Sequence, residues 1–340
     1  MVRLAVGRGA SRLLDAPRVT PEEAGLGPAV DALGGEIVRL RSRDGLRLAG
    51  RWLPAEYPPD SAAGGDGDEV WRADPHEAIL LLHGWSGSIA PDLVEYGPFL
   101  RRTAGVLGLD FRGHGDSDPA QTTFGLHEVE DVAGALTWFG ERGITRVALF
   151  GTSMGGITAL ASIAVLGDGS LPAADLDPYA PAHDVDPPRP RIVGAAVDSV
   201  PPELTVGVGN RMRVPFRRFV AAQMFEAARR RIGGDMRATE PIRIAGLLES
   251  VPIMLIHGEA DRTVPPKDGR RLAAAIGSRA EHWIVPGAAH SAGHATDLSA
   301  YEERVGAFLR RALSDARVAQ PIIGRPAQDD APEGGGLEGD

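Results

Sequence analysis

The segment Gly151-Thr152-Ser153-Met154-Gly155 combines residue types that can carry out nucleophilic chemistry. An apolar run at 146–150 precedes it and predicts a buried strand, and an Ala-rich stretch at 157–166 follows it and predicts a helix. A serine between two glycines at such a turn has the pattern of a nucleophile elbow. We expect the glycines to prevent a clash between strand and helix, and Ser153 to project at the positive end of the helix.

Two further residues supply the partners that a serine nucleophile needs. Asp261 and His290 each follow an apolar run that predicts a strand. A serine hydroxyl is a poor nucleophile until a base takes its proton, and imidazole titrates near neutrality, so it can accept that proton and return it. A carboxylate fixes the imidazole tautomer and stabilises the imidazolium. The candidate catalytic residues are therefore Ser153, Asp261 and His290.

Each of these partners has rivals in the sequence. His282 begins a predicted strand, and we expect it to point away from the site. His294 follows His290 by about one helical turn and can flank the pocket. Asp198 also ends a predicted strand, so it competes with Asp261 for the role of the acid.

From residue 36 onward the chain alternates predicted strands with predicted helices. An Asp-Gly turn joins two alternating stretches, 36–41 and 46–53, and predicts a hairpin. Further strands are predicted at 78–82, 106–109, 146–150, 192–197, 252–256 and 282–285. Strands that alternate with helices predict an α/β fold with a mostly parallel sheet and right-handed crossovers.

We divide the chain into five parts. The sequence assigns no role to the first, and the last is expected to be a disordered acidic tail. Between them lie two parts of an α/β core, with a small helical cap inserted before the strand that carries the acid. The parts are an N-terminal extension at 1–35, the core at 36–200 and 251–316, the cap at 201–250 and the tail at 317–340.

Composition excludes several kinds of site. The net charge of −10 argues against nucleic-acid binding, and the chain has no cysteine for disulfides, thiolate catalysis or metal binding. Metal-ligand spacings, a Walker-type phosphate loop and a dinucleotide fingerprint are all missing from the sequence, so we expect no cofactor. No apolar run reaches membrane-spanning length, and the first 17 residues do not have the pattern of a signal peptide. We expect a soluble, cytoplasmic protein, and the sequence leaves its oligomeric state open.

The ordered motifs resemble those of the serine α/β-hydrolases. His83-Gly84 after an early strand, Ser153, Asp261 and His290 occur in that family's order over most of 36–314. The resemblance implies an α/β-hydrolase fold and favours His290 and Asp261 over their rivals.

The same resemblance implies an oxyanion hole made by two backbone N–H groups, those of Met154 and Trp85. Since His83-Gly84 lacks the longer glycine run of some lipases, Ser86 remains an alternative to Trp85 as a donor. His83 is expected to be structural. The segment 110–117 is expected to shape a loop beside the site rather than to take part in catalysis.

The expected function is hydrolysis of a small-molecule carboxylic ester through a covalent acyl-enzyme. Other chemistries that use this scaffold stay open: thioesterase, peptidase, acyltransferase, cofactor-free haloperoxidase and carbon–carbon hydrolase. A non-catalytic binding member of the fold is a further alternative, although all three triad residues are present. The arginines of the cap can favour an acidic substrate or simply form a solvated face. Four apolar cap residues can line an acyl pocket or pack in the core: Phe216, Phe219, Met224 and Phe225.

Overall fold

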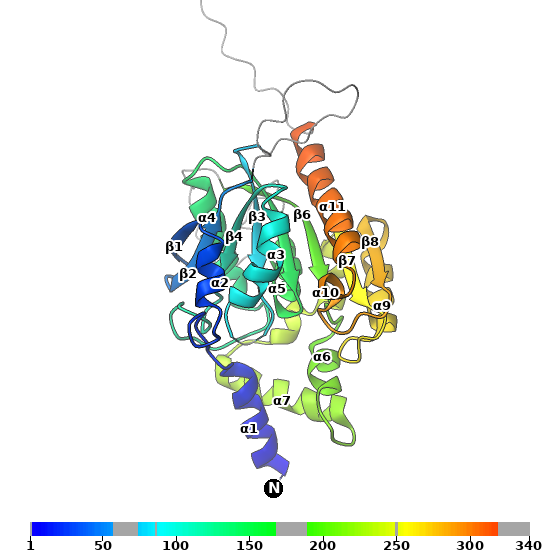
Figure 1. Cartoon of the computed structure of the whole chain (residues 1–340). Coiled ribbons are helices and arrows are strands. Elements are labelled where there is room, and N and C mark those ends of the chain that lie inside the picture. The colour runs from blue at the N-terminus through cyan, green and yellow to red at the C-terminus, as the bar shows by residue number, and fades with distance from the viewer. Residues whose placement is uncertain (1, 57–73, 86, 168–188, 249–250, 319–340) are drawn as a thin grey trace, which may run out of the picture.

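The computed structural model describes residues 2–56, 74–85, 87–167, 189–248 and 251–318. Its centre is a sheet of eight strands in the order β1-β2-β4-β3-β5-β6-β7-β8 (Figure 1). β1 and β2 form the predicted antiparallel hairpin, β2 pairs with β4 in antiparallel fashion, and all other neighbours are parallel. The strands are β1 (Glu36–Arg41), β2 (Arg47–Leu53), β3 (Glu77–Leu82), β4 (Gly105–Leu109), β5 (Arg146–Thr152), β6 (Arg191–Asp198), β7 (Ile253–Gly258) and β8 (Ala280–Val285). This arrangement confirms the predicted α/β fold.

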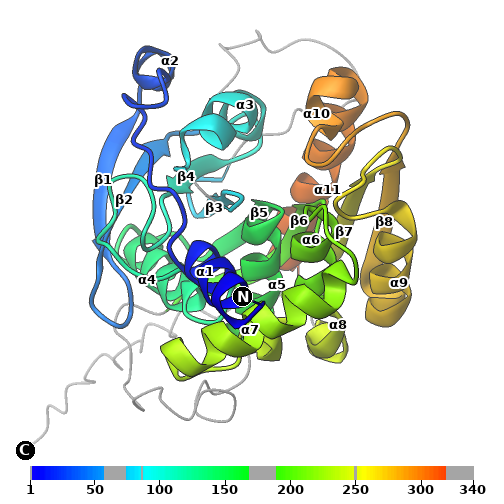
Figure 2. The ribbon, with the colours of Figure 1, turned by 90° about the horizontal axis from the view of Figure 1, so that it is seen from below.

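The central strands are buried on both faces, as their continuous apolar runs predict. Successive side chains of β3 enter opposite cores: Leu80 and Leu82 belong to one apolar cluster, Ile79 and Leu81 to the other. Figure 2 shows helices on both sides of the sheet. The first core contains residues of α4 (Glu128–Gly140), α5 (Met154–Leu166) and α9 (Pro266–Ile276), and the second contains residues of α3 (Ala90–Leu100) and α11 (Leu298–Val318).

A helical cap is inserted between β6 and β7, before the strand that leads to Asp261. The longest of its helices, α7, begins at Arg217, directly after Phe216 with a left-handed φ of 51°, and it ends where Gly233 takes a left-handed φ of 71°. The cap consists of α6 (Leu204–Asn210), α7 (Arg217–Ile232), η2 (Met236–Thr239), α8 (Pro241–Ile244) and η3 (Ala245–Leu247).

The N-terminal segment, to which the sequence assigned no role, forms two helices. α1 (Val2–Leu14) lies beside α7 of the cap, and α2 (Gly27–Ala32) lies near α3 (Figures 1 and 2). The side chain of Arg231 in α7 donates hydrogen bonds to Ser11 Oγ (2.6 Å) and to the Gly7 carbonyl (3.2 Å). The cap therefore packs against a helix from the N-terminal end of the chain.

The last described helix overlaps the start of the segment at 317–340. Arg317 and Val318 belong to α11, so this helix continues two residues into the segment expected to be a tail. Residues 319–340, on which the prediction of disorder falls, lie outside the described residues. Within the ranges that the structure describes, no helix is both long enough and apolar enough to cross a membrane.

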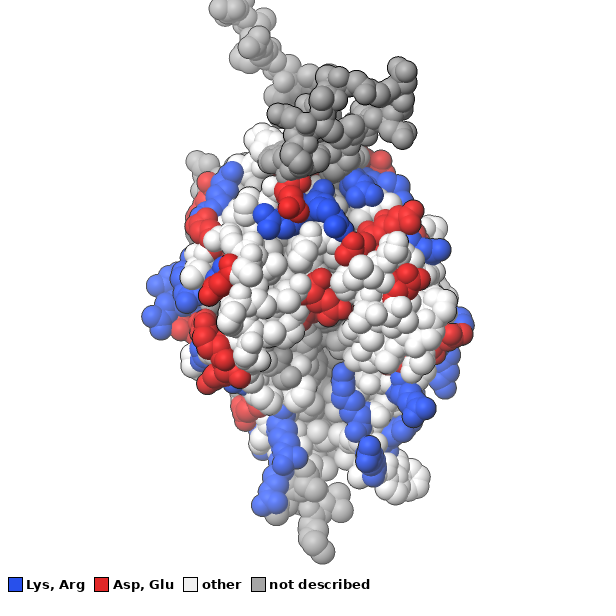
Figure 3. All heavy atoms as spheres, viewed as in Figure 1, with Lys and Arg blue, Asp and Glu red and all other residues white. Residues whose placement is uncertain are grey.

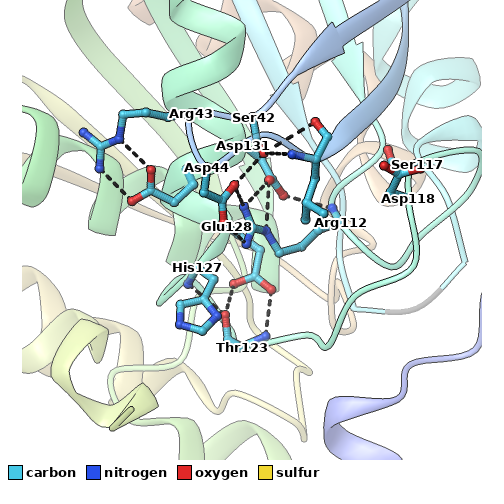
Figure 4. A network of polar contacts seen from close by, with 12 residues as sticks. Ser42, Arg43, Asp44, Arg112, Ser117, Asp118, Thr123, His127, Glu128 and Asp131 are labelled. Carbon is cyan, nitrogen blue, oxygen red and sulfur yellow. Dashed lines mark hydrogen bonds and ion pairs between the residues drawn. The ribbon is translucent and has the colours of Figure 1, made fainter. Parts of the chain in front are cut away.

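A buried ion network fixes the loop after β4, which carries the sequence segment 110–117. The Arg112 guanidinium lies between the carboxylates of Asp131 in α4 (2.7 Å) and Asp44 in the hairpin turn (2.8 Å) (Figure 4). Asp131 is fully buried, so removing Arg112 would leave an uncompensated charge in the interior. The loop is thereby held to two elements that are distant in sequence.

Candidate active site

Ser153 lies at the sharp turn from β5 to α5 and has a φ of 48°, a left-handed value that is rare for a residue with a side chain. The turn is possible because its neighbours are glycines. A Cβ on Gly151 would lie 2.5 Å from the Gly155 carbonyl carbon, and a Cβ on Gly155 would lie 2.1 Å from the Leu82 oxygen. The expected reason for both glycines is therefore confirmed. The positive φ places Ser153 at the N-terminus of α5, as predicted.

The structure brings Ser153, His290 and Asp261 together. His290 Nε2 lies 3.2 Å from Ser153 Oγ, and His290 Nδ1 lies 2.8 Å from Asp261 Oδ2. The other carboxylate oxygen of Asp261 accepts hydrogen bonds from the backbone N–H groups of Thr263 (2.7 Å) and Val264 (2.8 Å). Both carboxylate oxygens thus accept hydrogen bonds, and the Asp261 side chain is fully buried. The His290 side chain is 18% exposed, so the base is less enclosed than the acid.

The loops that carry Asp261 and His290 are bound to each other directly. The Ala260 N–H donates to the Ala288 carbonyl (2.9 Å), and the Gly287 N–H donates to Glu259 Oε2 (3.0 Å). A side chain at Gly258 would collide with the Ala288 carbonyl, since its Cβ would lie 2.3 Å from that oxygen. Close approach of the two loops therefore depends on a glycine at the end of β7.

The rival residues of the sequence lie elsewhere. Asp198 accepts hydrogen bonds from Tyr301 OH (2.8 Å) and Ser199 Oγ (2.8 Å) rather than from His290, and its burial raises its pKa to about 6. His294 lies between Glu95 and Glu302, at 3.3 and 3.4 Å, and does not line the cavity.

His282 and Asp198 differ in how they relate to the site. His282 packs its ring against His257, with centroids 5.4 Å apart, and is not bonded to Ser153 or Asp261. Asp198 contacts the site only indirectly. It accepts a hydrogen bond from the Ser199 hydroxyl, and that hydroxyl accepts one from the N–H of Ser291 (2.9 Å), the residue after His290.

The loop after β3 passes beside the nucleophile. A Cβ on Gly84 would lie 3.9 Å from the Ser153 Cβ, so the backbone that leads to Trp85 is adjacent to the elbow. His83 holds this loop: its Nδ1 donates to the Gly84 carbonyl (2.7 Å), and its Nε2 accepts the Phe111 N–H (3.1 Å). Burial lowers the pKa of His83, which keeps the ring neutral as this bonding requires. Ser86, the alternative donor, lies outside the described residues.

A cavity of about 320 Å³ opens over Ser153 and Met154. Its walls come from three parts of the chain: the elbow and the start of α5, the cap around α6, and α1. The lining is mostly apolar, and two arginines, Arg12 and Arg211, also line it. The other lining residues are Leu13, Trp85, Phe124, Ile157, Pro201, Leu204, Gly207, Val208, Met212 and Val264.

Several lining residues were not among the sequence candidates. Leu13 and Arg12 belong to α1, whose apolar residues Val6, Ala10 and Leu13 have helical spacing, but no local pattern tells where that helix packs. The apolar cap residues named from the sequence do not line the cavity. Met224 and Phe225 are buried in the core, whereas Phe216 and Phe219 are 85% and 66% exposed.

The described residues contain no group of three or more metal-ligating side chains placed to hold an ion. The geometry instead offers a hydroxyl, an imidazole and a carboxylate in line, beside backbone N–H groups and an apolar cavity. Such a set can transfer a proton from the serine and stabilise the resulting imidazolium.

Comparison with known proteins identifies the family of the chain. The alpha/beta hydrolase family matches residues 79–305, which is more than half of the chain. The chain belongs to this family. This α/β hydrolase is 23% identical over 301 residues to the uncharacterized protein YfhR of Escherichia coli, covering 87% of this chain and 84% of YfhR.

Solved structures support the fold of this α/β hydrolase. The esterase Pf2001 of Pyrococcus furiosus superposes with a TM-score of 0.58 at 20% identity, covering 88% of this chain and 98% of that one. The esterase EaEST of Exiguobacterium antarcticum has a TM-score of 0.52 at 13% identity, covering 80% of this chain and 99% of that one. At these identities the likeness is one of fold.

Proposed function

We propose that this α/β hydrolase cleaves carboxylic ester bonds through a covalent acyl-enzyme formed on Ser153. The observation that carries the proposal is the hydrogen-bonded series Ser153–His290–Asp261, with distances of 3.2 and 2.8 Å. Its position at a strained strand-to-helix turn, open to a cavity of small-molecule size, supports the same assignment. The two esterases that share the fold are consistent with it.

In this mechanism Asp261 holds the proton of His290 on Nδ1, so that Nε2 is free to accept the proton of Ser153. The serine oxygen attacks the ester carbonyl, and the developing oxyanion is bound by backbone N–H groups, which we assign to Met154 and Trp85. The Met154 N–H is one of the first of α5 and has no partner within the helix. His290 then gives its proton to the leaving alcohol. Water, deprotonated by the same imidazole, hydrolyses the acyl-enzyme and restores Ser153.

The test is hydrolysis of p-nitrophenyl esters from acetate to palmitate by the wild type, by Ser153→Ala and by Ser162→Ala. Ser162 is a buried serine on the same helix α5 that lies outside the cavity, so it controls for loss of a hydroxyl from the interior. We expect Ser153→Ala to lower kcat by about 10⁴-fold or more and Ser162→Ala to leave it nearly unchanged.

Labelling by a fluorophosphonate separates the remaining possibilities. If the wild type hydrolyses no ester but the reagent still adds mass to Ser153, the serine is activated for another acyl or related reaction of this scaffold, such as thioester hydrolysis, amide hydrolysis or acyl transfer. If the reagent adds no mass to Ser153 and no ester is hydrolysed, the proposed nucleophile is wrong.

A further inference from the structure

The cavity over Ser153 is lined by positive charge, although the protein as a whole is negatively charged. The whole chain carries a net charge of −10, yet among the described residues no Asp or Glu lines the cavity, and two arginines do. Arg12 comes from the last turn of α1, and Arg211 follows α6 directly. Two arginine side chains therefore line the same cavity from two different elements.

Most other arginines of the cap are paired with a carboxylate on the protein. Arg229 and Arg230 both contact Glu226, and Arg218 lies 3.7 Å from Asp268. Further pairs are Arg237 with Asp235 at 3.0 Å and Arg243 with Glu240 at 2.9 Å. These paired side chains fit the simpler of the two expectations for the cap arginines, a solvated face.

Arg12 and Arg211 differ from these residues. Within the described part of the chain, neither forms an ion pair with a carboxylate, and both are exposed. The charge of Asp261 acts on Arg211 without a direct ion pair. Arg211 extends toward Gly207, another lining residue: its Nη1 lies 4.0 Å from the position of a Cβ on that glycine. Figure 3 shows basic side chains gathered over the cap end of this face, with acidic ones concentrated on the body of the molecule.

We infer that the cavity selects esters that carry a second, ionised carboxylate, such as the half-esters of dicarboxylic acids. This inference rests on the proposed esterase function. A guanidinium presents a planar pair of N–H donors that matches a carboxylate, and two of them beside an apolar surface would hold an anionic group while the carbon chain lies against the lining. Their positive charges also offset the repulsion that a negatively charged protein exerts on an anion.

The test compares two esters with the same acyl length and leaving group: mono-(4-nitrophenyl) adipate, which is anionic, and 4-nitrophenyl hexanoate, which is neutral. The quantity measured is the ratio of their kcat/KM values, for the wild type, Arg12→Gln, Arg211→Gln and the double variant. Arg213→Gln is the matched control, because Arg213 is exposed on the same cap, has no carboxylate partner among the described residues, and does not line the cavity.

We expect each single substitution to lower the ratio about fivefold and the double variant to lower it further, through KM for the adipate ester. The control should keep the wild-type ratio, and added salt should lower that ratio, since exposed charges are screened. An unchanged ratio in the double variant, or an equal fall in the Arg213→Gln control, would overturn the inference.

Failure of the esterase function is detected separately. If the wild type hydrolyses neither ester, binding of monoethyl adipate and of ethyl hexanoate is measured by quenching of tryptophan fluorescence, because Trp85 lines the cavity. Tighter binding of the adipate, lost in the double variant, supports anion recognition without ester hydrolysis. Equal binding of the two esters overturns it.

Discussion

Two carboxylates lie near the ends of neighbouring parallel strands: Asp198 ends β6, and Asp261 follows β7 by three residues. Their surroundings give them different chemistry. Asp261 faces an imidazole and two backbone N–H groups, whereas Asp198 faces two hydroxyl groups in a fully buried place. Only the first arrangement can orient and charge-stabilise a histidine.

The two acids are therefore separable by substitution. Asp261→Asn should lower kcat by about 10⁴-fold with little loss of stability, because the amide no longer stabilises the His290 tautomer that accepts the Ser153 proton. Asp198→Asn should retain most of the activity and cost about 1 to 2 kcal/mol of unfolding free energy, because it weakens buried hydrogen bonds to Tyr301 and Ser199. Ester kinetics and urea denaturation measure the two effects. A larger kcat loss in Asp198→Asn than in Asp261→Asn would contradict the assignment.

Single catalytic residues could be predicted from the sequence where a short segment contains both the residue and the neighbours that its role requires. Ser153 is flanked by the glycines that its turn requires, and Asp261 and His290 each follow a predicted strand that the structure contains. Arg12 and Arg211 have no such local signature. Their position at one cavity depends on how α1 and the cap pack, which residue types and spacing do not encode.

Among the elements, α1 shows most clearly what tertiary packing adds. No helix was predicted for this segment, and its partner α7 lies some 200 residues away in the sequence. The N-terminal segment also contains the hydrogen bonds of a helix start without the helix that normally follows them. Thr20 and Glu23 form the reciprocal hydrogen bonds of a capping box (2.9 and 3.3 Å), yet only a turn follows, and Gly25 adopts a φ of 71°. The helix α2 begins two residues later, at Gly27.

Contact between α1 and α7 should determine how well the cavity is formed. A Cβ at Gly9 would lie 2.7 Å from the Met224 Cε, whereas the closest atom to a Cβ at Gly7 is the Arg231 Nη2, 3.9 Å away. We expect Gly9→Val to displace α1 and to lower kcat/KM for esters about tenfold. Gly7→Val places the same β-branched residue in the same helix and should stay near the wild-type value. Equal kinetics for the two variants would show that α1 does not shape the site.

For the whole molecule, a carboxyl group with a raised pKa links stability to pH. Asp92 accepts a hydrogen bond from Thr152 Oγ1 (2.7 Å), next to the nucleophile, and burial raises its pKa to about 7, with the nearby charges of Glu95 and Asp198 acting in the same direction. A raised pKa means that the folded protein holds this proton more tightly than the unfolded chain. The stabilisation is complete below the unfolded pKa of 3.8 and is lost as the pH rises through 7.

The variant Asp92→Asn isolates this effect, because its amide oxygen can still accept the Thr152 bond but does not titrate. We expect the unfolding free energy of the wild type to fall relative to the variant between pH 4 and pH 8, by at most about 4 kcal/mol. Urea denaturation of both proteins across that range measures the difference. A difference that stays constant with pH would show that Asp92 keeps its proton, or loses it, in both states.

The Trp85 side chain links the N-terminal helix to the loop beside the elbow. Its indole N–H donates to the Leu13 carbonyl of α1 (3.3 Å), and Trp85 is also the residue to which we assign an oxyanion donor. Because α1 forms one wall of the cavity, a substrate that displaced this helix would also remove the anchor of that loop. Discrimination by size would then act on turnover as well as on affinity, because an oversized ester would disturb the loop that carries the Trp85 N–H.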